Sequence, residues 1–109
     1  MENLISPDKN IFSVSYLSNL LKTAIENQFG YVQVKGELSG VKRHTSGHLY
    51  FTLKDADAIL DGVSWKGSVD KLGFVPSDGL EVICTGKITT YAARSKYQMI
   101  VSTMVPSGE

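Results

Sequence analysis

The sequence predicts a mainly β fold, in which one helix precedes a small barrel of five short strands. Apolar residues recur at three- and four-residue steps over residues 13–30, which is the period of a helix. From residue 31 onward they mostly alternate with polar residues, in five stretches that turn residues separate. Glycines lie inside three of these stretches, at Gly36, Gly62 and Gly86, and such glycines suit a strongly bent sheet.

The helix is expected to begin near Ser13 or Ser15, because either hydroxyl can accept a hydrogen bond from the first helical amides. Gly30 suits the left-handed residue that ends many helices. Residues 1–12, which come before the periodic pattern, are predicted to form a flexible leader. The apolar positions that make the helix amphipathic are Val14, Leu17, Leu20, Leu21, Ala24, Ile25 and, at the end of the pattern, Phe29.

The five strands are expected over residues 31–39, 47–54, 58–65, 80–91 and 96–104. A turn is predicted at Asp55 to Asp57, because short acidic side chains bond their own backbone. The connection over 66–79 carries glycines and a proline and has room for a short helix near 69–72. The pattern of the third strand leaves its core side open. The side that faces the core is either that of Leu60, Gly62 and Ser64 or that of Ile59, Asp61, Val63 and Trp65. The order of elements matches an OB-fold, a five-stranded Greek-key barrel; an open sheet packed on the helix is the rival.

Composition narrows the class of protein. The chain has 109 residues, which favours one domain, and 42% of them are apolar, which suits a soluble globular fold. Eleven Lys and Arg balance eleven Asp and Glu, which argues against a broadly basic surface or a polybasic membrane anchor. Cys84 is the only cysteine, and neither a membrane-spanning run nor a signal peptide is apparent. We therefore expect a reduced, cytoplasmic protein without a membrane partner.

Catalytic and metal chemistry find little support. Four residues of extended chain separate His44 from His48 by about 13 Å, which is too far for both rings to reach one metal ion. The turn explains Asp55 and Asp57 more simply than a metal site does. Cys84 lies on the apolar side of its strand, as a buried structural thiol would. No catalytic residue, metal or cofactor is therefore expected in this domain.

Binding of a single nucleic-acid strand has a better physical basis, because bases stack on aromatic side chains and cations hold the phosphates. The polar side of the second strand carries His48 and Tyr50, and Trp65 joins them if Asp61 and Val63 also face outward. In an OB-fold the loops that flank the ligand face join strands one and two and strands four and five. These loops carry Lys42, Arg43, His44, Tyr91, Arg94 and Lys96. Ordinary cross-strand packing on a solvated sheet is the alternative explanation.

Several motifs in sequence order resemble the N-terminal domain of the large subunit of bacterial exodeoxyribonuclease VII. They are FSVS over 12–15, VKGELS over 34–39, SGHLYFTLKD over 46–55, YxxRxxYQ over 91–98 and PSGE over 106–109. The resemblance implies an OB-fold that binds single-stranded DNA. It also implies a parent enzyme that degrades single-stranded DNA from both ends to oligonucleotides and binds several small subunits. Residues 13–105 would then form the binding domain, and 106–109 would begin a linker to a catalytic domain.

The resemblance implies DNA-facing roles for His48, Tyr50, Trp65, Lys66 and Arg94. We combine these residues with the cations of the two loops. His48, Tyr50 and Trp65 are predicted to stack on bases. The residues predicted to contact phosphates are Lys42, Arg43, Lys66, Arg94 and Lys96. Asp61 departs from what a DNA-facing row would carry. Two alternatives remain: a domain that docks on the rest of the nuclease subunit with little affinity for DNA, and a domain that is catalytic by itself.

Overall fold

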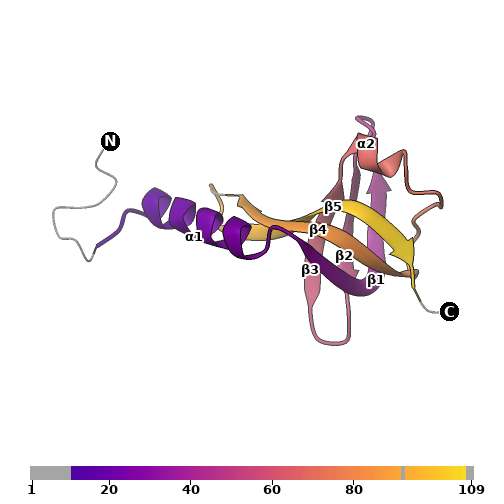
Figure 1. Cartoon of the computed structure of the whole chain (residues 1–109), viewed down its shortest axis with the longest axis horizontal. Helices are drawn as coiled ribbons and strands as arrows, with labels where there is room; N and C mark the ends of the chain where they lie inside the picture. Colours follow the sequence, from indigo (N-terminus) through magenta and orange to yellow (C-terminus); the bar gives the residue numbers. More distant parts are fainter. Residues whose placement is uncertain (1–10, 92, 108–109) are drawn as a thin grey trace.

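The computed structural model describes residues 11–91 and 93–107 and confirms the mainly β fold (Figure 1). Most of the predicted leader, residues 1–10, and the end of the predicted linker, residues 108–109, lie outside the described residues. No helix in the described part is long and apolar enough to span a bilayer. The elements, in chain order, are α1 (Val14–Gln28), β1 (Val32–Arg43), β2 (Leu49–Lys54), β3 (Ile59–Ser64), α2 (Lys66–Val69), β4 (Glu81–Tyr91) and β5 (Lys96–Pro106).

The strands close into a barrel in the order β1-β2-β3-β5-β4, which is the Greek-key order of an OB-fold and excludes the open sheet. The long strand β1 pairs with β4 through its first half and with β2 through its second half. The barrel is closed by a short parallel pairing of β3 with β5, in which Gly62 lies opposite Met99 and Val63 opposite Ile100.

Strand register decides which side of β3 faces the core. Gly62 lies opposite the buried Phe51, and Val63 lies opposite the exposed Tyr50. Paired residues of antiparallel strands point to the same side. Leu60, Gly62 and Ser64 therefore face inward, and Asp61, Val63 and Trp65 form the outward row.

The core fills the barrel and is closed at one end by Val69 of the short helix α2. Position 62 of β3 requires glycine, because a Cβ there would lie 2.5 Å from Cε2 of the core residue Phe51. The predicted inward residues of β2 and β4 are buried as expected, except Ile88, which is partly buried. The core residues are Leu38, Leu49, Phe51, Leu53, Val69, Val82, Cys84, Met99, Val101 and Met104.

Three predicted boundaries were wrong. The fifth strand does not end at residue 104, because β5 pairs with β4 as far as Pro106, where the linker was expected to begin. The first strand does not end at residue 39, because a bulge between Ser39 and Lys42 lets β1 continue to Arg43. Gly40 takes a left-handed φ of 60° in this bulge, and the amide of Val41 donates to Asp78 Oδ1 at 2.8 Å. The short helix begins at Lys66, directly after β3, rather than near residue 69.

Helix α1 begins as predicted at Ser13, whose hydroxyl accepts a hydrogen bond from the amide of Tyr16. It ends at Gln28, the capping residue Phe29 has a φ of −125°, and Gly30 does not take the predicted left-handed conformation. The carbonyl of Phe29 instead accepts a hydrogen bond from the amide of Ile88 in β4, at 2.9 Å. This contact leads the chain directly from the helix into the barrel.

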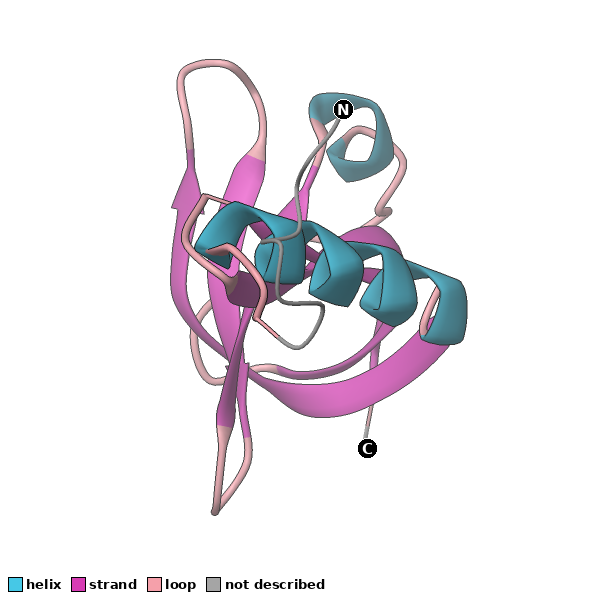
Figure 2. Ribbon diagram, turned by 90° about the vertical axis from the view of Figure 1, so that its left-hand side faces the viewer, coloured by secondary structure: helices cyan, strands magenta, loops and turns pink. Residues whose placement is uncertain are grey.

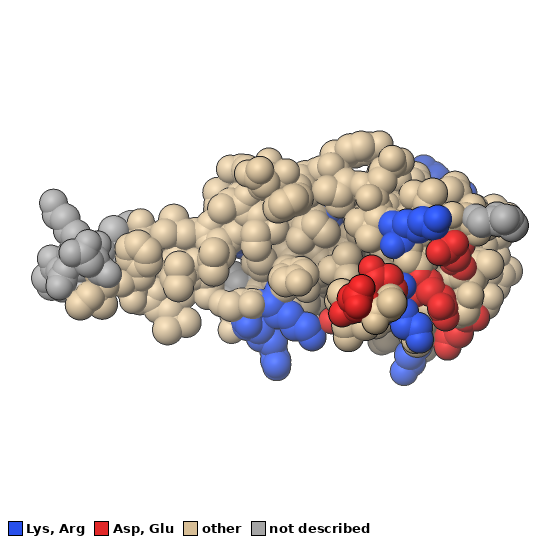
Figure 3. Space-filling model, turned by 90° about the horizontal axis from the view of Figure 1, so that it is seen from below, with Lys and Arg blue, Asp and Glu red and all other residues tan. Residues whose placement is uncertain are grey.

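Helix α1 projects from the barrel, on a different side from α2 (Figures 1 and 2). Its polar side faces the β4–β5 hairpin: Lys22 Nζ donates to Thr89 Oγ1 at 3.0 Å, and Ser18 contacts Ser95 at 2.5 Å. On the face seen in Figure 3, the charged side chains nearest this projecting part are a group of Lys and Arg where it joins the barrel, whereas both signs mix over the barrel itself. Most of the apolar helix positions remain exposed: Val14, Leu17, Leu20, Leu21, Ala24 and Phe29.

Candidate nucleic-acid interface

The outward face of β2, β3 and β5 forms the floor of the candidate interface. Val63 faces outward but is only 1% exposed, between Tyr50 on β2 and Ile100 on β5. Tyr50 is 41% exposed, and its ring meets the edge of His44, with 6.2 Å between the ring centroids. Tyr50 is thus the accessible aromatic side chain of this floor, and bases stack on such side chains.

His48 and Trp65 form one corner of this face, where β2 begins and β3 ends. Their rings meet edge to face, with centroids 5.0 Å apart. The amide of Lys66 donates to Nδ1 of His48 at 2.9 Å. In the neutral imidazole the proton therefore lies on Nε2, which is the nitrogen left to donate to a ligand. Trp65 keeps 45% of its surface exposed.

Cations surround this corner, but two of them share a carboxylate. Arg43 Nε donates to the carbonyl of Gly47 at 2.8 Å, and its NH2 group lies 3.3 Å from Asp70 Oδ1. Lys66 Nζ lies 2.9 Å from the other oxygen, Oδ2. The hydrogen bond from Lys66, helped by the charges of Lys66 and Arg43, lowers the pKa of Asp70. Lys42 lies at the same end of the face, where it pairs with Tyr50 across β1 and β2.

The two remaining predicted cations lie toward the β4–β5 hairpin. Lys96 Nζ contacts Asp61 Oδ2 at 3.1 Å, which ties the start of β5 to the outward row of β3. Arg94 lies exposed in the turn of the hairpin, where its amide donates to the carbonyl of Tyr91. The fold therefore groups Lys42, Arg43, His48, Tyr50, Trp65 and Lys66 at one end and leaves Arg94 and Lys96 at the other.

Sequence reasoning missed Asp70. It lies four residues after Lys66, which is the spacing of an ion pair on a helix. The sequence indicated this ion pair only weakly, because the helix was expected to begin later, which would leave Lys66 outside it.

Tyr91, one of the predicted loop residues, is held in place by its hydroxyl, which donates a hydrogen bond to Gln98 Oε1 at 2.6 Å.

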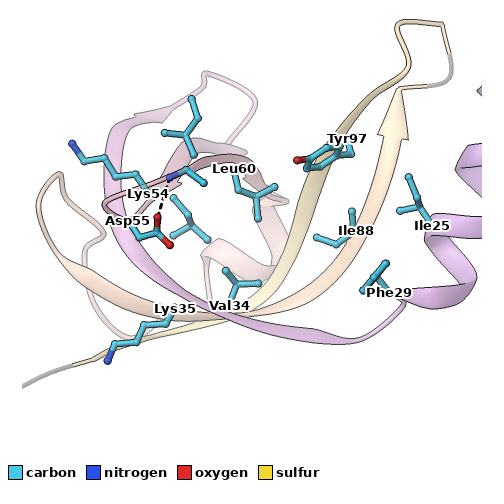
Figure 4. Close-up of a pocket in the computed structure, with 12 residues that line it drawn as sticks. Ile25, Phe29, Val34, Lys35, Lys54, Asp55, Leu60, Ile88 and Tyr97 are labelled. Atoms are coloured by element: carbon cyan, nitrogen blue, oxygen red, sulfur yellow. Dashed lines mark hydrogen bonds between the residues drawn. The ribbon is translucent and has the colours of Figure 1, made fainter.

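An open apolar groove of about 430 Å³ lies at another part of the barrel, beside the end of α1 (Figure 4). Its lining includes Ile25 and Phe29 of the helix, Leu60 of β3 and Tyr97 of β5. Asp55 on its rim accepts hydrogen bonds from the amides of Asp57 and Ala58, which confirms the predicted turn. Among the described residues, no group of three His, Cys, Asp or Glu side chains is placed to hold a metal ion.

Comparison with known families gives one match over most of the chain. A family model described as "OB-fold nucleic acid binding domain" matches residues 12–105. The chain is also similar to proteins named "Exodeoxyribonuclease 7 large subunit", as the sequence motifs predicted. The relative from Erythrobacter litoralis is 58% identical over 97 residues, which cover 89% of this chain and 20% of the relative. The relative from Caulobacter vibrioides is 48% identical over 110 residues, which cover 99% of this chain and 22% of the relative. The chain thus spans about a fifth of these relatives' length.

Solved structures share the fold at low sequence identity. A structure of yeast Stn1 and Ten1 is 15% identical with a TM-score of 0.62, over 87% of this chain and 57% of that one. A replication protein A heterotrimer bound to single-stranded DNA is 10% identical with a TM-score of 0.60, over 73% of this chain and 59% of that one. These likenesses support the barrel topology.

Proposed function

Because the chain belongs to the OB-fold nucleic acid binding domain family, we propose that it binds single-stranded DNA without sequence preference. The observation that carries the proposal is the corner where His48, Tyr50 and Trp65 lie on one outward face with cations beside them. Stacking on such side chains is tolerant of sequence, because every base has an aromatic face.

The similarity to exodeoxyribonuclease 7 large subunits extends the proposal to a longer protein. There the domain would deliver single strands to a nuclease domain, which degrades them from both ends to oligonucleotides. Small subunits of the same enzyme would be partners of that protein. In this division of labour the domain described above contributes binding, and hydrolysis belongs to the rest of the protein.

The fluorescence of Trp65, the only tryptophan, offers a direct test. We expect quenching when an oligothymidine strand is added and little change with a matched duplex. Replacing Trp65 with Ala should weaken binding of labelled oligothymidine about 5- to 150-fold at every salt concentration, because stacking contributes about 1–3 kcal/mol per base. Tyr31→Ala is the matched control, since Tyr31 is exposed but lies outside the face. Equal affinity of the wild type and Trp65→Ala would remove Trp65 from the interface.

The phosphate contacts have their own test, because each one releases counterions from the DNA. For a single strand, log affinity falls with log salt at a slope of about −0.7 per neutralised phosphate. Arg94→Ala should make this slope shallower by about that amount, and Lys35→Ala, a cation on β1 beside Glu81, should leave it unchanged. Identical slopes for the wild type and Arg94→Ala would show that Arg94 does not contact phosphate.

A second candidate function is docking on the rest of a large nuclease subunit. The exposed apolar side of α1 and the neighbouring groove favour it, because soluble monomers rarely leave such a surface uncovered. A flat anisotropy titration with oligothymidine at low salt would favour docking over DNA binding.

A further inference from the structure

Two carboxylates contact three of the five cations that are predicted to bind phosphates. Asp70 is shared by Arg43 and Lys66, and Asp61 holds Lys96. All these side chains are about half exposed, so water and DNA can reach the same groups. The positive charge of the face is therefore partly neutralised before any DNA arrives.

Asp70 is placed to compete with a phosphate for the donors of both cations. Arg43 presents its Nε and NH2 edge, and this edge is already occupied by the carbonyl of Gly47 and by Asp70. That edge is the one that would otherwise grip a phosphate in two places. A phosphate must then displace Asp70 or use the donors that remain.

Lys66 is constrained in a similar way. Its aliphatic stem lies against Gly47, which has a left-handed φ of 94°; a Cβ at Gly47 would be 2.8 Å from Cγ and Cδ of Lys66. The stem thus runs across the loop between β1 and β2, toward Asp70. Its backbone amide is held by His48, so Lys66 is fixed at both ends.

We propose that Asp70 is a built-in competitor for DNA phosphates, which weakens single-strand binding by occupying Arg43 and Lys66. Asp61 acts on Lys96 in the same manner. This inference rests on the proposed function, and it names what limits the affinity of that interface.

Removing the competitor has two measurable consequences. The affinity for DNA rises, because a negative charge near the phosphates disappears and the cations are released. The salt dependence also steepens. When DNA displaces Asp70, the freed carboxylate attracts a cation from solution, and this uptake offsets part of the counterion release.

The experiment compares Asp70→Asn with Asp57→Asn by anisotropy of labelled oligothymidine over a range of salt concentrations. Asp57 lies in the exposed turn between β2 and β3, so its replacement changes the net charge equally without touching the face. We expect Asp70→Asn to bind about three- to tenfold more tightly than the wild type at low salt, with a slope more negative by up to about 0.7. Asp61→Asn should change binding in the same direction. Circular dichroism and thermal unfolding confirm that each variant is folded.

A further pair of variants separates competition from a general charge effect. In a background where Arg43 and Lys66 are both alanine, Asp70→Asn should raise affinity less than twofold, because the cations it would release are gone. An equal gain in both backgrounds, or equal binding of Asp70→Asn and Asp57→Asn, overturns the inference while the proposed function stands. Weaker binding by a folded Asp70→Asn also overturns it, because Asp70 would then position the cations for DNA. Failure of the wild type to bind oligothymidine overturns the proposed function itself, and the inference with it.

Discussion

The side chain of Cys84 in β4 is completely shielded from solvent by the barrel. Its surface is fully buried, between β1 and β5 neighbours, and burial raises the pKa of its thiol to about 12. The thiolate is the form that reacts, so the native thiol is protected twice, by burial and by protonation. A structural role for this cysteine follows.

We predict that a thiol reagent labels Cys84 in the native domain only through unfolding. At neutral pH, labelling should be slow in buffer and rapid in concentrated urea, which the absorbance of the released thiolate measures. Because the pKa in the folded state lies above the ordinary value of 9.0, this group's contribution to stability is present below pH 9 and is lost as the pH rises toward 12. Rapid labelling in buffer, with circular dichroism unchanged, would contradict the buried placement.

The β4–β5 hairpin is the element that most depends on one glycine. A bulge lies between Thr85 and Gly86, where the register of the two strands shifts. A Cβ at Gly86 would lie 1.9 Å from the carbonyl oxygen of Ile100, and backbone cannot move aside as a flexible side chain can. The close approach of the strands therefore requires glycine at this position.

We predict that Gly86→Ala lowers the free energy of unfolding by at least about 2 kcal/mol, measured by urea denaturation. Gly67→Ala is the matched control, because nothing lies within 4 Å of a Cβ there and the residue is helical. Its unfolding free energy should stay unchanged or rise by up to about 1 kcal/mol. Equal stability of the two variants would mean that the strands separate at the bulge at little cost.

At the scale of the whole molecule, the helical projection stands out. The described residues extend over 56 × 31 × 21 Å, and α1 rests on the hairpin through polar contacts while its apolar side faces solvent. A single helix of 15 residues is marginal in water without apolar packing. The chain spans about a fifth of its relatives' length, and docking on the rest of such a protein, the second candidate function, would cover this face.

We predict that residues 14–28 exchange their amide hydrogens at least tenfold more slowly in a full-length large subunit than in the 109-residue domain. The core strand β5 is the internal reference, because its buried residues should be protected in both. Hydrogen exchange followed by mass spectrometry reports both segments in one experiment. Equal exchange over α1 in the two proteins would count against docking of this face.

The sequence by itself determined the order of the elements and most of the inward residues, and it favoured a barrel over the open sheet that only the structure excludes. Period-two patterns in β2 and β4 identified their core sides, and Asp55 identified its turn, because both signals are local in the chain. The same pattern placed His48 and Tyr50 on the polar side of their strand, whereas it left the side of Trp65 open. Their roles in DNA binding stay predictions.

Only the tertiary structure decided the rest, since it depends on residues far apart in the chain. The outward row of β3 followed from its register with β2, and the extension of β1 from a bulge whose amide is held by Asp78. The partners of the cations could not be read from composition: Asp70 reaches Arg43, 27 residues away, only because the barrel brings α2 beside the end of β1. The helix pattern predicted an apolar face correctly, but the polar contacts with the hairpin turned that face toward solvent. Local periodicity says which side chains share a face, and only the closed barrel says what that face meets.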